Sequence, residues 1–497
     1  MQETKSYRRR LGMKTHSIKF NFIMNAILTV SSIIFPLITA PYVLRVLQPE
    51  GIGRVDFSAS VITYFSMFAS LGIPTYGIRT CAKVRDDKEA LSKTVQELML
   101  LNGGTMVLTY FVFLILLFLV PDFAGEKTLL LINSVSMVLN VVGVTWFYNA
   151  MEQYTYITTC SIAFKIISIV MMFLWIKNPN DYVKYGAITV FAGSASYLLN
   201  FINLHKYVSF RKIAPYEFKK HLKPILIFFA TSAAISVYTN MDIVMIGFMK
   251  GSREVGYYTA AIKVKTLLVS LITSLGTVLL PRLSYYIEKK DKGAFQRMVV
   301  KAFNFVMIIG ISVSVYFTFM APEAIQLLAG ESYGASVLPM QILMPAVLFI
   351  GLSNITGIQI LTPQGEEKKV LYSIIWGALL DFVLNLFLIG KYGATGAAFA
   401  TLLAEFVVLA VQCMYLKKML GQIVKEISVR ENLVAALVAS VVMLLMKHTI
   451  AFSTFGELVI TAVLFFGLYG VILLVQREQI TVEMVKMGVT ILKRKGK

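Results

Sequence analysis

The chain has 497 residues, of which 57% are hydrophobic and 15% charged, and its formal net charge is +20 at pH 7. Soluble domains carry about 25% charged residues, and the apolar residues here recur in runs of about 20, enough to cross roughly 30 Å of hydrocarbon as a helix. The composition therefore excludes a soluble globular protein and predicts an all-α polytopic membrane protein.

In chain order, the apolar runs predict about 14 transmembrane helices. The first run follows a basic segment, but it is longer than a signal peptide and no small-residue cleavage site follows it. We therefore expect it to be retained as a membrane helix. The expected spans are 20–46, 56–79, 94–120, 127–148, 157–177, 184–204, 222–247, 256–282, 297–320, 335–361, 370–389, 393–416, 430–447 and 457–475.

The connections between these spans alternate in charge. Most of the 47 Lys and Arg residues fall in one set of connections, and the opposite set is short and poor in them. Positive residues stay on the cytoplasmic side, so both termini are expected to be cytoplasmic in a bacterial cell membrane. The net charge then reflects topology and attraction to anionic lipid, and no nucleic-acid partner is expected.

The residue types that support metal or catalytic chemistry are sparse. Three widely spaced cysteines and four histidines form no metal-binding motif, so we expect no metal and no cofactor. The longest connection of the short set, 321–334, is too small for a catalytic domain. Any binding must then occur among the helices, and an enzyme is not expected.

An internal repeat divides the chain. The stretches LQPEGIGRVDFSAS (47–60) and SREVGYYTAAIK (252–263) each place a glycine before aromatic and small residues, and SLG occurs at 70–72 and at 274–276. A common offset between such matches indicates a parallel repeat, as in some transporters. The predicted parts are a basic N-terminus (1–19), two six-helix lobes (20–220 and 221–420), two further helices (421–475) and a basic tail (476–497).

Several charged residues fall inside or near the expected spans. A charge in hydrocarbon costs at least about 2.5 kcal/mol, so such residues should face a cavity or a partner. The candidate cavity cations are Arg45, Arg54, Lys165, Lys263 and Lys265, and the candidate cavity acids, which would bind a coupling ion, are Asp242, Asp381 and Glu405.

Arg45 has two interpretations. It is either an arginine that extends to the membrane interface or a group at the rim of a cavity. Pro36 and Pro41 remove backbone hydrogen bonds within the first span, and irregular backbone at membrane depth is tolerated beside protein or a watery cavity. A cationic cavity suits an anionic ligand, above all a phosphate, which arginine binds through two hydrogen bonds.

The other charged residues also leave alternatives open. Lys165 either extends to the nearby membrane surface or faces the cavity. Lys263 and Lys265 are about 200° apart around a helix, so only one of them can face the cavity. Asp242 either binds an ion or a lysine, or makes a structural hydrogen bond. Asp381 and Glu405 are each either a protonatable site or half of a mutual bridge.

Two stretches carry a family resemblance. The first is PLITAPYVLRVLQPEGIGRVDFSASVITYFSMFASLGIPTYGIRTCAKVRDD, and the second joins YTNMDIVMIG to VGYYTAAIKVKTLLVSLITSLGTVLLPRLSYY. They resemble Wzx-type polysaccharide flippases of the multidrug/oligosaccharidyl-lipid/polysaccharide exporter superfamily, and the likeness covers most of residues 20–420. The sequence departs from the family at Gln48, where the family usually has glycine.

The resemblance implies a fold similar to multidrug exporters and lipid II flippases, with two lobes around a cationic cavity that opens alternately to each side. It implies Arg45 and Lys263 as cavity cations and Asp242 as a cavity acid. The implied substrate is a polyprenyl-pyrophosphate-linked oligosaccharide repeat unit, and the implied partners are the lipid bilayer and the polymerase and glycosyltransferases of the same pathway. We expect a monomer.

Besides a non-transporting assembly partner of a polysaccharide pathway, two other classes of function are weighed against a flippase. A multidrug/cation antiporter of the same superfamily needs an acidic cavity, whereas the candidate cavity here is mainly cationic. A membrane-embedded polysaccharide polymerase or glycosyltransferase needs catalytic groups on a sizeable outer loop, which the chain lacks. The sequence also has no GxxxxGK[ST] motif for ATP.

Overall fold

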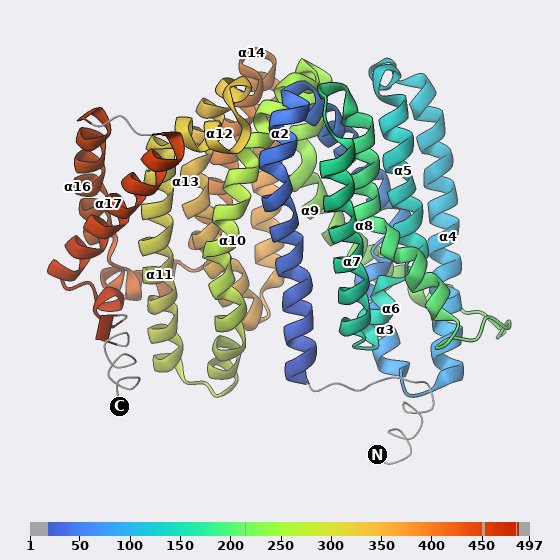
Figure 1. Cartoon of the computed structure of the whole chain (residues 1–497). Coiled ribbons are helices and arrows are strands. Elements are labelled where there is room, and N and C mark those ends of the chain that lie inside the picture. The colour runs from blue at the N-terminus through green and yellow to red at the C-terminus, as the bar shows by residue number, and fades with distance from the viewer. Residues whose placement is uncertain (1–17, 214, 450–452, 484, 487–497) are drawn as a thin grey trace, which may run out of the picture. The chain divides into compact units, whose positions relative to one another are not determined.

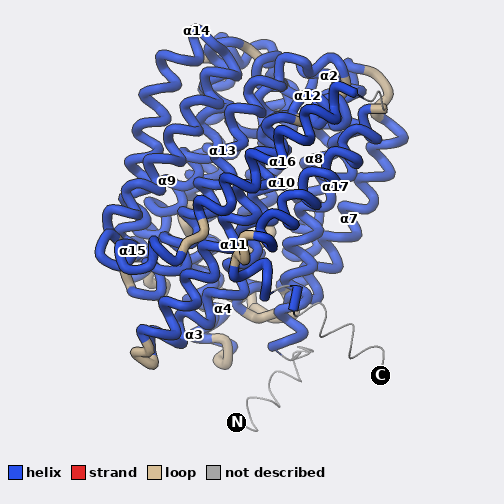
Figure 2. Tube along the Cα trace, turned by 90° about the vertical axis from the view of Figure 1, so that its left-hand side faces the viewer, coloured by secondary structure: helices blue, strands red, loops and turns tan. Residues whose placement is uncertain are grey.

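A computed structural model describes residues 18–213, 215–449, 453–483 and 485–486. These residues form helices and no strands (Figure 2). A helix pairs its interior backbone N–H and C=O groups within itself, which is why it can cross hydrocarbon. The predicted all-α fold is confirmed, whereas residues 1–17 of the expected N-terminal segment and residues 487–497 of the expected tail lie outside the described part.

Within the described residues, 12 helical segments are long and apolar enough to cross a membrane. Two of them, Ile23–Val84 and Glu367–Tyr415, contain 62 and 49 residues. Since about 20 residues cross hydrocarbon, each is longer than one crossing needs. The sequence-based count of about 14 spans divides both segments in two, and that count stays a prediction.

The chain divides into two compact units, Met1–Gly256 and Tyr257–Lys497. The division falls within α10 (Ser252–Glu288), and the expected lobe boundaries stay a prediction. The first unit contains α2 (Ile18–Ser70), α3 (Ile73–Val84), α4 (Lys88–Leu119), α5 (Lys127–Val142), α6 (Thr145–Ala150), α7 (Tyr154–Trp175), α8 (Tyr182–Leu204) and α9 (Lys219–Lys250), labelled in Figure 1. The second contains α11 (Lys292–Phe319), α12 (Ala321–Ala329), α13 (Val337–Ser353), a π-helix (Asn354–Leu361), α14 (Glu367–Tyr415), α15 (Lys417–Ile423), α16 (Val429–Thr449) and α17 (Thr454–Val475).

Three expected segments have different boundaries in the structure. The expected span 56–79 is interrupted by Gly72 in the left-handed region, and 127–148 by Val144, whose φ is 37°. The expected loop 321–334 instead contains α12 and a 3-10 turn. The backbone, rather than hydrophobicity, sets these boundaries, because a residue with positive φ cannot continue a right-handed helix.

Polar caps fix several helix starts. The carboxylate of Asp87 accepts from the backbone N–H groups of Glu89 and Ala90, at 2.9 and 3.1 Å, at the start of α4. Asp291 accepts from the N–H of Ala294 at 2.9 Å at the start of α11. Each cap satisfies backbone donors that have no partner inside the helix.

Each unit has its own apolar core. In the first unit, Trp146, Phe147 and Tyr148 of α6 pack with residues of α3 and α4. In the second, Tyr316 of α11 and Phe465 of α17 belong to a cluster that joins α11, α16 and α17.

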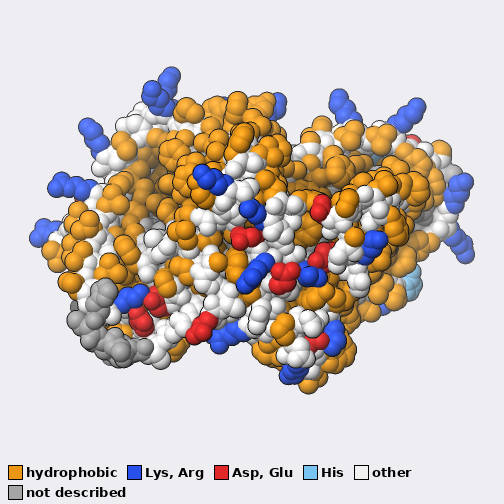
Figure 3. Space-filling model, turned by 90° about the horizontal axis from the view of Figure 1, so that it is seen from above, with side chains coloured by type: hydrophobic (Ala, Val, Ile, Leu, Met, Phe, Trp, Pro, Cys, Tyr) orange, Lys and Arg blue, Asp and Glu red, His pale blue; other side chains and the backbone are white. Residues whose placement is uncertain are grey.

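Many other large apolar side chains are exposed, including Phe111, Phe118, Phe387 and Val463. Exposed apolar side chains of this size suit lipid tails rather than water. Seen from above, hydrophobic side chains also cover much of the surface, with charged side chains among them (Figure 3).

A buried polar cluster ties the start of α9 to α4. Oε2 of Glu97, a fully buried residue, lies 2.8 Å from Nε2 of His221 and 3.1 Å from the ammonium of Lys220. Its other oxygen accepts from the backbone N–H of Glu217 at 2.7 Å. At the edge of this cluster, Lys93 donates to Glu217 at 2.8 Å, and this hydrogen bond lowers the pKa of the Glu217 carboxyl. The cluster thus fixes the connection that leads into α9.

The two copies of the repeated glycine meet within the first unit. A Cβ atom at Gly53 would overlap the carbonyl oxygen of Ser252, and one at Gly256 would overlap the carbonyl oxygen of Pro49. Gly53 and Gly256 are 203 positions apart, as are Pro49 and Ser252. The contact is therefore reciprocal between the repeats, and it requires glycine at both positions.

Replacing Gln48 by glycine is expected to stabilise the protein. Gln48 has φ 58° and ψ 176°, a backbone region that costs a non-glycine residue about 1–3 kcal/mol. Glycine also raises the conformational entropy of the unfolded chain, which lowers stability by about 0.4–1 kcal/mol. The net effect of Q48G should be a gain of about 1 kcal/mol in the free energy of unfolding and a higher Tm for the detergent-solubilised chain. The control Q48A keeps a Cβ atom, and an equal Tm rise in Q48A would contradict the strain argument.

Replacing Gly53 by alanine is expected to destabilise the protein, because the new methyl group overlaps the Ser252 backbone. Overpacking of this kind costs about 1–3 kcal/mol, which thermal unfolding should report as a lower Tm. Gly103 in α4 is the matched control, since a Cβ atom there meets nothing within 4 Å. A Tm for G53A as high as that for G103A would refute the close contact.

Candidate functional site

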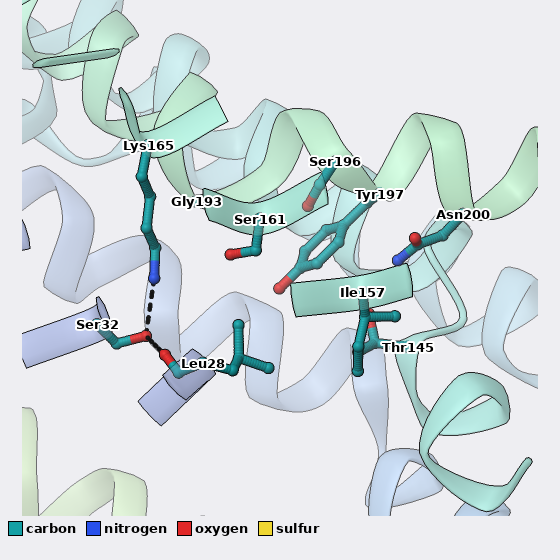
Figure 4. Close-up of a pocket in the computed structure, with 10 residues that line it drawn as sticks. All are labelled: Leu28, Ser32, Thr145, Ile157, Ser161, Lys165, Gly193, Ser196, Tyr197 and Asn200. Carbon is teal, nitrogen blue, oxygen red and sulfur yellow. Dashed lines mark hydrogen bonds between the residues drawn. The ribbon is translucent and has the colours of Figure 1, made fainter. Parts of the chain in front are cut away.

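A pocket of about 280 Å³ lies within the first unit, among α2, α6, α7 and α8. Figure 4 shows its lining, in which polar side chains outnumber apolar ones. The lining residues are Leu28, Ser32, Thr145, Ile157, Ser161, Lys165, Gly193, Ser196, Tyr197 and Asn200. Of these four helices, α6, α7 and α8 lie entirely within segments that are long and apolar enough to cross a membrane. The pocket is therefore a polar space among apolar helices.

Lys165 supplies the positive charge of this pocket. Its ammonium donates to the hydroxyls of Ser31 and Ser32 at 3.1 and 2.9 Å. Both serines in turn donate to the carbonyl oxygen of Leu28, at 2.7 and 3.0 Å. The serine hydroxyls thus act as acceptors for Lys165 and hold the ammonium on the α2 side of the pocket.

The charge of Lys165 has no carboxylate beside it. Across the described ranges, no Asp or Glu oxygen comes within 4.0 Å of its ammonium, and its hydrogen-bond partners are neutral. The side chain is half-buried. A cation in this position attracts an anion more strongly than it would in water, because the local dielectric constant is low.

Two backbone features place polar groups around this cation. Gly143, at the end of α5, lets α8 approach closely, since a Cβ atom there would overlap the Cβ of Tyr197. Val144 follows in the left-handed region and starts α6 at Thr145. A β-branched residue rarely has positive φ, and strained backbone of this kind clusters at functional sites.

Two buried polar atoms of the lining lack a hydrogen-bond partner within the described residues. They are Oγ1 of Thr145 and Oδ1 of Asn200, and Asn200 is only 2% exposed. Figure 4 shows the hydroxyls of Ser161 and Tyr197 and the amide of Asn200 pointing to the side where Lys165 lies. A buried polar atom that lacks a hydrogen bond lowers the stability of the fold by about 1–3 kcal/mol. A polar ligand or water in the pocket would supply the missing hydrogen bonds.

Arg54, another candidate cation, lies in a different environment. Its Nε is 3.3 Å from Glu50 and 3.6 Å from Glu126. Its Nη1 donates to the hydroxyl of Tyr182 at 3.2 Å, and the guanidinium also lies over that ring. Two carboxylates match this charge, and the structure does not bring Arg54 into the pocket of Lys165.

The remaining candidates fall in both units. In the first unit, Arg45 is exposed and Asp242 is buried; in the second, Lys263 and Lys265 are half-buried. None of these four side chains lines the pocket of Lys165. A shared cavity for Arg45 and Lys263 stays a prediction.

The two acids of the second unit lie on either side of a break in α14. Gly393, with φ 54° and ψ −131°, separates the half with Asp381 from the half with Glu405. Asp381 is 1% and Glu405 9% exposed. Both of the expected roles, a protonatable site or a mutual bridge, stay predictions.

The polar lining around Lys165 was not expected from the sequence. Ser161 and Lys165 are four residues apart in α7, so they share one helix face. Ser196, Tyr197 and Asn200 form a similar polar stripe in α8. Such stripes within apolar runs are a usable signal, although the sequence does not show that the two stripes meet.

Within the described ranges, no three His, Cys, Asp or Glu side chains lie together in a group that could hold a metal ion.

Comparisons with known proteins agree with this membrane architecture. The family model described as "Polysaccharide biosynthesis protein" matches residues 18–287, and the one described as "MatE" matches 228–387. A protein of Escherichia coli K12 named as a candidate O-antigen transporter is 23% identical over 81% of this chain and 97% of its own length. A Shigella dysenteriae protein with the same name is 24% identical over 79% of this chain and 98% of its own.

Solved structures show the same fold. The lipid II flippase MurJ in an inward closed conformation aligns with a TM-score of 0.71, at 17% identity, over 92% of this chain and all of that one. A multidrug resistance MATE family transporter in an inward-facing conformation aligns with a TM-score of 0.59, at 13% identity, over 82% of this chain and 99% of that one. The expected likeness to lipid II flippases and multidrug exporters is confirmed.

Replacing Lys165 by methionine is expected to leave the protein without bound ligand as stable as wild type, or up to about 1 kcal/mol more stable. Methionine removes a half-buried charge that no acid matches, and Ser31 and Ser32 keep their bonds to Leu28. Thermal unfolding in detergent measures this, with Lys177→Met, an exposed residue just beyond the end of α7, as the control. A loss above 2 kcal/mol for K165M alone would indicate a structural bridge instead of a ligand group.

Proposed function

The chain belongs to the family of polysaccharide biosynthesis proteins, and on that premise we propose that it is a flippase for lipid-linked oligosaccharides. Its substrate is a polyprenyl pyrophosphate that carries an oligosaccharide repeat unit. The protein moves this molecule from the cytoplasmic to the outer leaflet of a bacterial cell membrane, with both of its own termini in the cytoplasm. The product feeds the synthesis of a cell-surface polysaccharide such as a capsule, O-antigen, exopolysaccharide or teichoic-type polymer.

The observation that carries this proposal is the pocket of Lys165, which combines a cation with hydroxyl and amide groups among apolar helices. Sugars need hydroxyl and amide partners, and anions need a cation. The two relatives named as candidate O-antigen transporters support the same substrate class, because the likeness covers nearly their whole length.

In the proposed mechanism, Arg45 and Lys263 meet the pyrophosphate in a cavity between the two six-helix lobes. The sugars enter the polar interior, and the polyprenyl chain stays in the lipid. The lobes then close on the cytoplasmic side and open on the outer side. A pyrophosphate needs more than one cation, because each phosphate oxygen that leaves water must gain a donor.

Two sources of energy fit this mechanism. Moving a charge of about −2 outward from a negative interior is favourable by roughly 4–5 kcal/mol per 100 mV. Alternatively, Asp242, Asp381 or Glu405 bind an ion whose gradient resets the transporter. Translocation at the full rate in vesicles with neither a potential nor an ion gradient would exclude both sources.

A multidrug/cation antiporter is the second candidate, favoured by the MatE match over 228–387. Export of a cationic drug requires an acid in the binding site, whereas the described pocket presents Lys165. A deletion strain separates the two. An antiporter predicts sensitivity to cationic drugs, and a flippase predicts loss of surface polysaccharide with unchanged drug tolerance.

Replacing Arg45 or Lys263 by glutamine is expected to slow translocation at least about tenfold, because each variant leaves phosphate charge without a partner. The measurement follows a fluorescent polyprenyl-pyrophosphate oligosaccharide in vesicles that contain the purified chain. Arg211 and Lys418 are exposed residues in connections, so R211Q and K418Q serve as matched controls. Unchanged rates in R45Q and K263Q, at equal protein content, would rule out these residues as phosphate ligands.

A further inference from the structure

We propose that the pocket of Lys165 binds one sugar ring of the translocated oligosaccharide, and that Lys165 binds an acidic substituent on that ring. The inference rests on the proposed function and deepens it, because it assigns a sugar class to a site of known position. The acidic substituent is a carboxylate, as in a uronic acid.

The unmatched charge is the first step. Lys165 is the ionised residue among the pocket-lining side chains, and its ammonium is bonded to two neutral serine hydroxyls. A buried charge is normally paired with an opposite one. Arg54 shows the alternative in the same unit, since two carboxylates match it. An anionic group of the substrate would pair with the charge of Lys165, as Glu50 and Glu126 pair with the charge of Arg54.

The neutral lining gives the second step. Thr145 Oγ1 and Asn200 Oδ1 are buried without partners, and Asn200 is 98% buried. The hydroxyls of Ser161 and Tyr197 point to the same side of the pocket (Figure 4). Hydroxyls donate and accept, and the Asn200 oxygen accepts. A ring with several hydroxyl groups satisfies such a set, whereas an apolar ligand leaves it unsatisfied.

The size of the pocket gives the third step. Its volume of about 280 Å³ is just below the range of typical ligand pockets, which run from about 300 to 1,000 Å³. One ring fits, and an oligosaccharide does not. Leu28 and Ile157 supply an apolar patch for the C–H face of that ring.

The choice of carboxylate over phosphate follows from the donors. Arginine binds phosphate through two parallel hydrogen bonds, and the lining contains no arginine. A single ammonium with one hydrogen-bond direction left beyond Ser31 and Ser32 matches a single anionic oxygen. A phosphate group, whether free or on a lipid, is therefore a poorer ligand for this pocket.

Binding of small probes to the purified full-length chain tests the assignment. Saturation-transfer NMR in detergent compares glucuronate, glucose and inorganic phosphate at equal concentrations. We expect glucuronate to bind at least about tenfold more tightly than glucose, since a hydrogen bond to a charged group contributes more than a neutral one. We expect phosphate to compete with glucuronate only weakly.

Variants then assign the preference to Lys165. K165Q should reduce the preference for glucuronate over glucose to less than twofold while leaving glucose binding unchanged. K165R should keep the preference. K177Q, which removes a charge just beyond the end of α7 and outside the pocket, should bind like wild type. The Tm of each variant confirms folding, and K165R covers the case in which K165Q does not fold.

Several results would overturn the proposal. They are equal binding of glucuronate and glucose, tighter binding of phosphate, no binding of any probe, or an unchanged preference in folded K165Q. If the chain translocates lipid-linked oligosaccharide and yet gives one of these results, the sugar assignment fails and the flippase stands. If it binds glucuronate through Lys165 but translocates nothing in vesicles, the flippase fails.

Discussion

A charge among membrane helices has to be solvated by something other than water, and Lys165 in the first unit is such a charge. At the centre of a bilayer a lysine costs about 2.5 kcal/mol or more. Here two serines of α2 accept from Lys165, while helices α6 and α8 bring further hydroxyl and amide groups to the same space. These neutral protein groups accept from the ammonium without matching its charge, which leaves the site open to an anion.

Much of the helical architecture could be predicted because it depends on apolar runs. The two C-terminal helices were expected at 430–447 and 457–475 and occur as α16 and α17, and the expected gap at 390–392 falls beside the break at Gly393. The errors arise at Leu71 and Val144, which interrupt expected spans with positive φ although their residue types do not signal it. Their backbone is set by packing, which a local pattern does not contain.

The candidate site was predictable in part for the same reason. Lys165 was identified because a charge within an apolar run is conspicuous. Its surroundings were not, since Ser31, Thr145 and Tyr197 come from distant parts of the chain. Arg54 and Lys165 show the limit of reasoning from residue type. Both are cations near or within spans, but among the described residues only Arg54 of the two is matched by acids, one in its own helix and one from another segment.

The reciprocal glycine contact bears on the origin of the chain. Each repeat presents the same small patch, a carbonyl oxygen followed four residues later by a glycine, and each patch contacts its own counterpart. Self-complementary contact of this kind is the mark of a two-fold symmetric dimer. A gene that duplicated while its product already paired with itself would carry that contact into one polypeptide, with glycine kept at both positions.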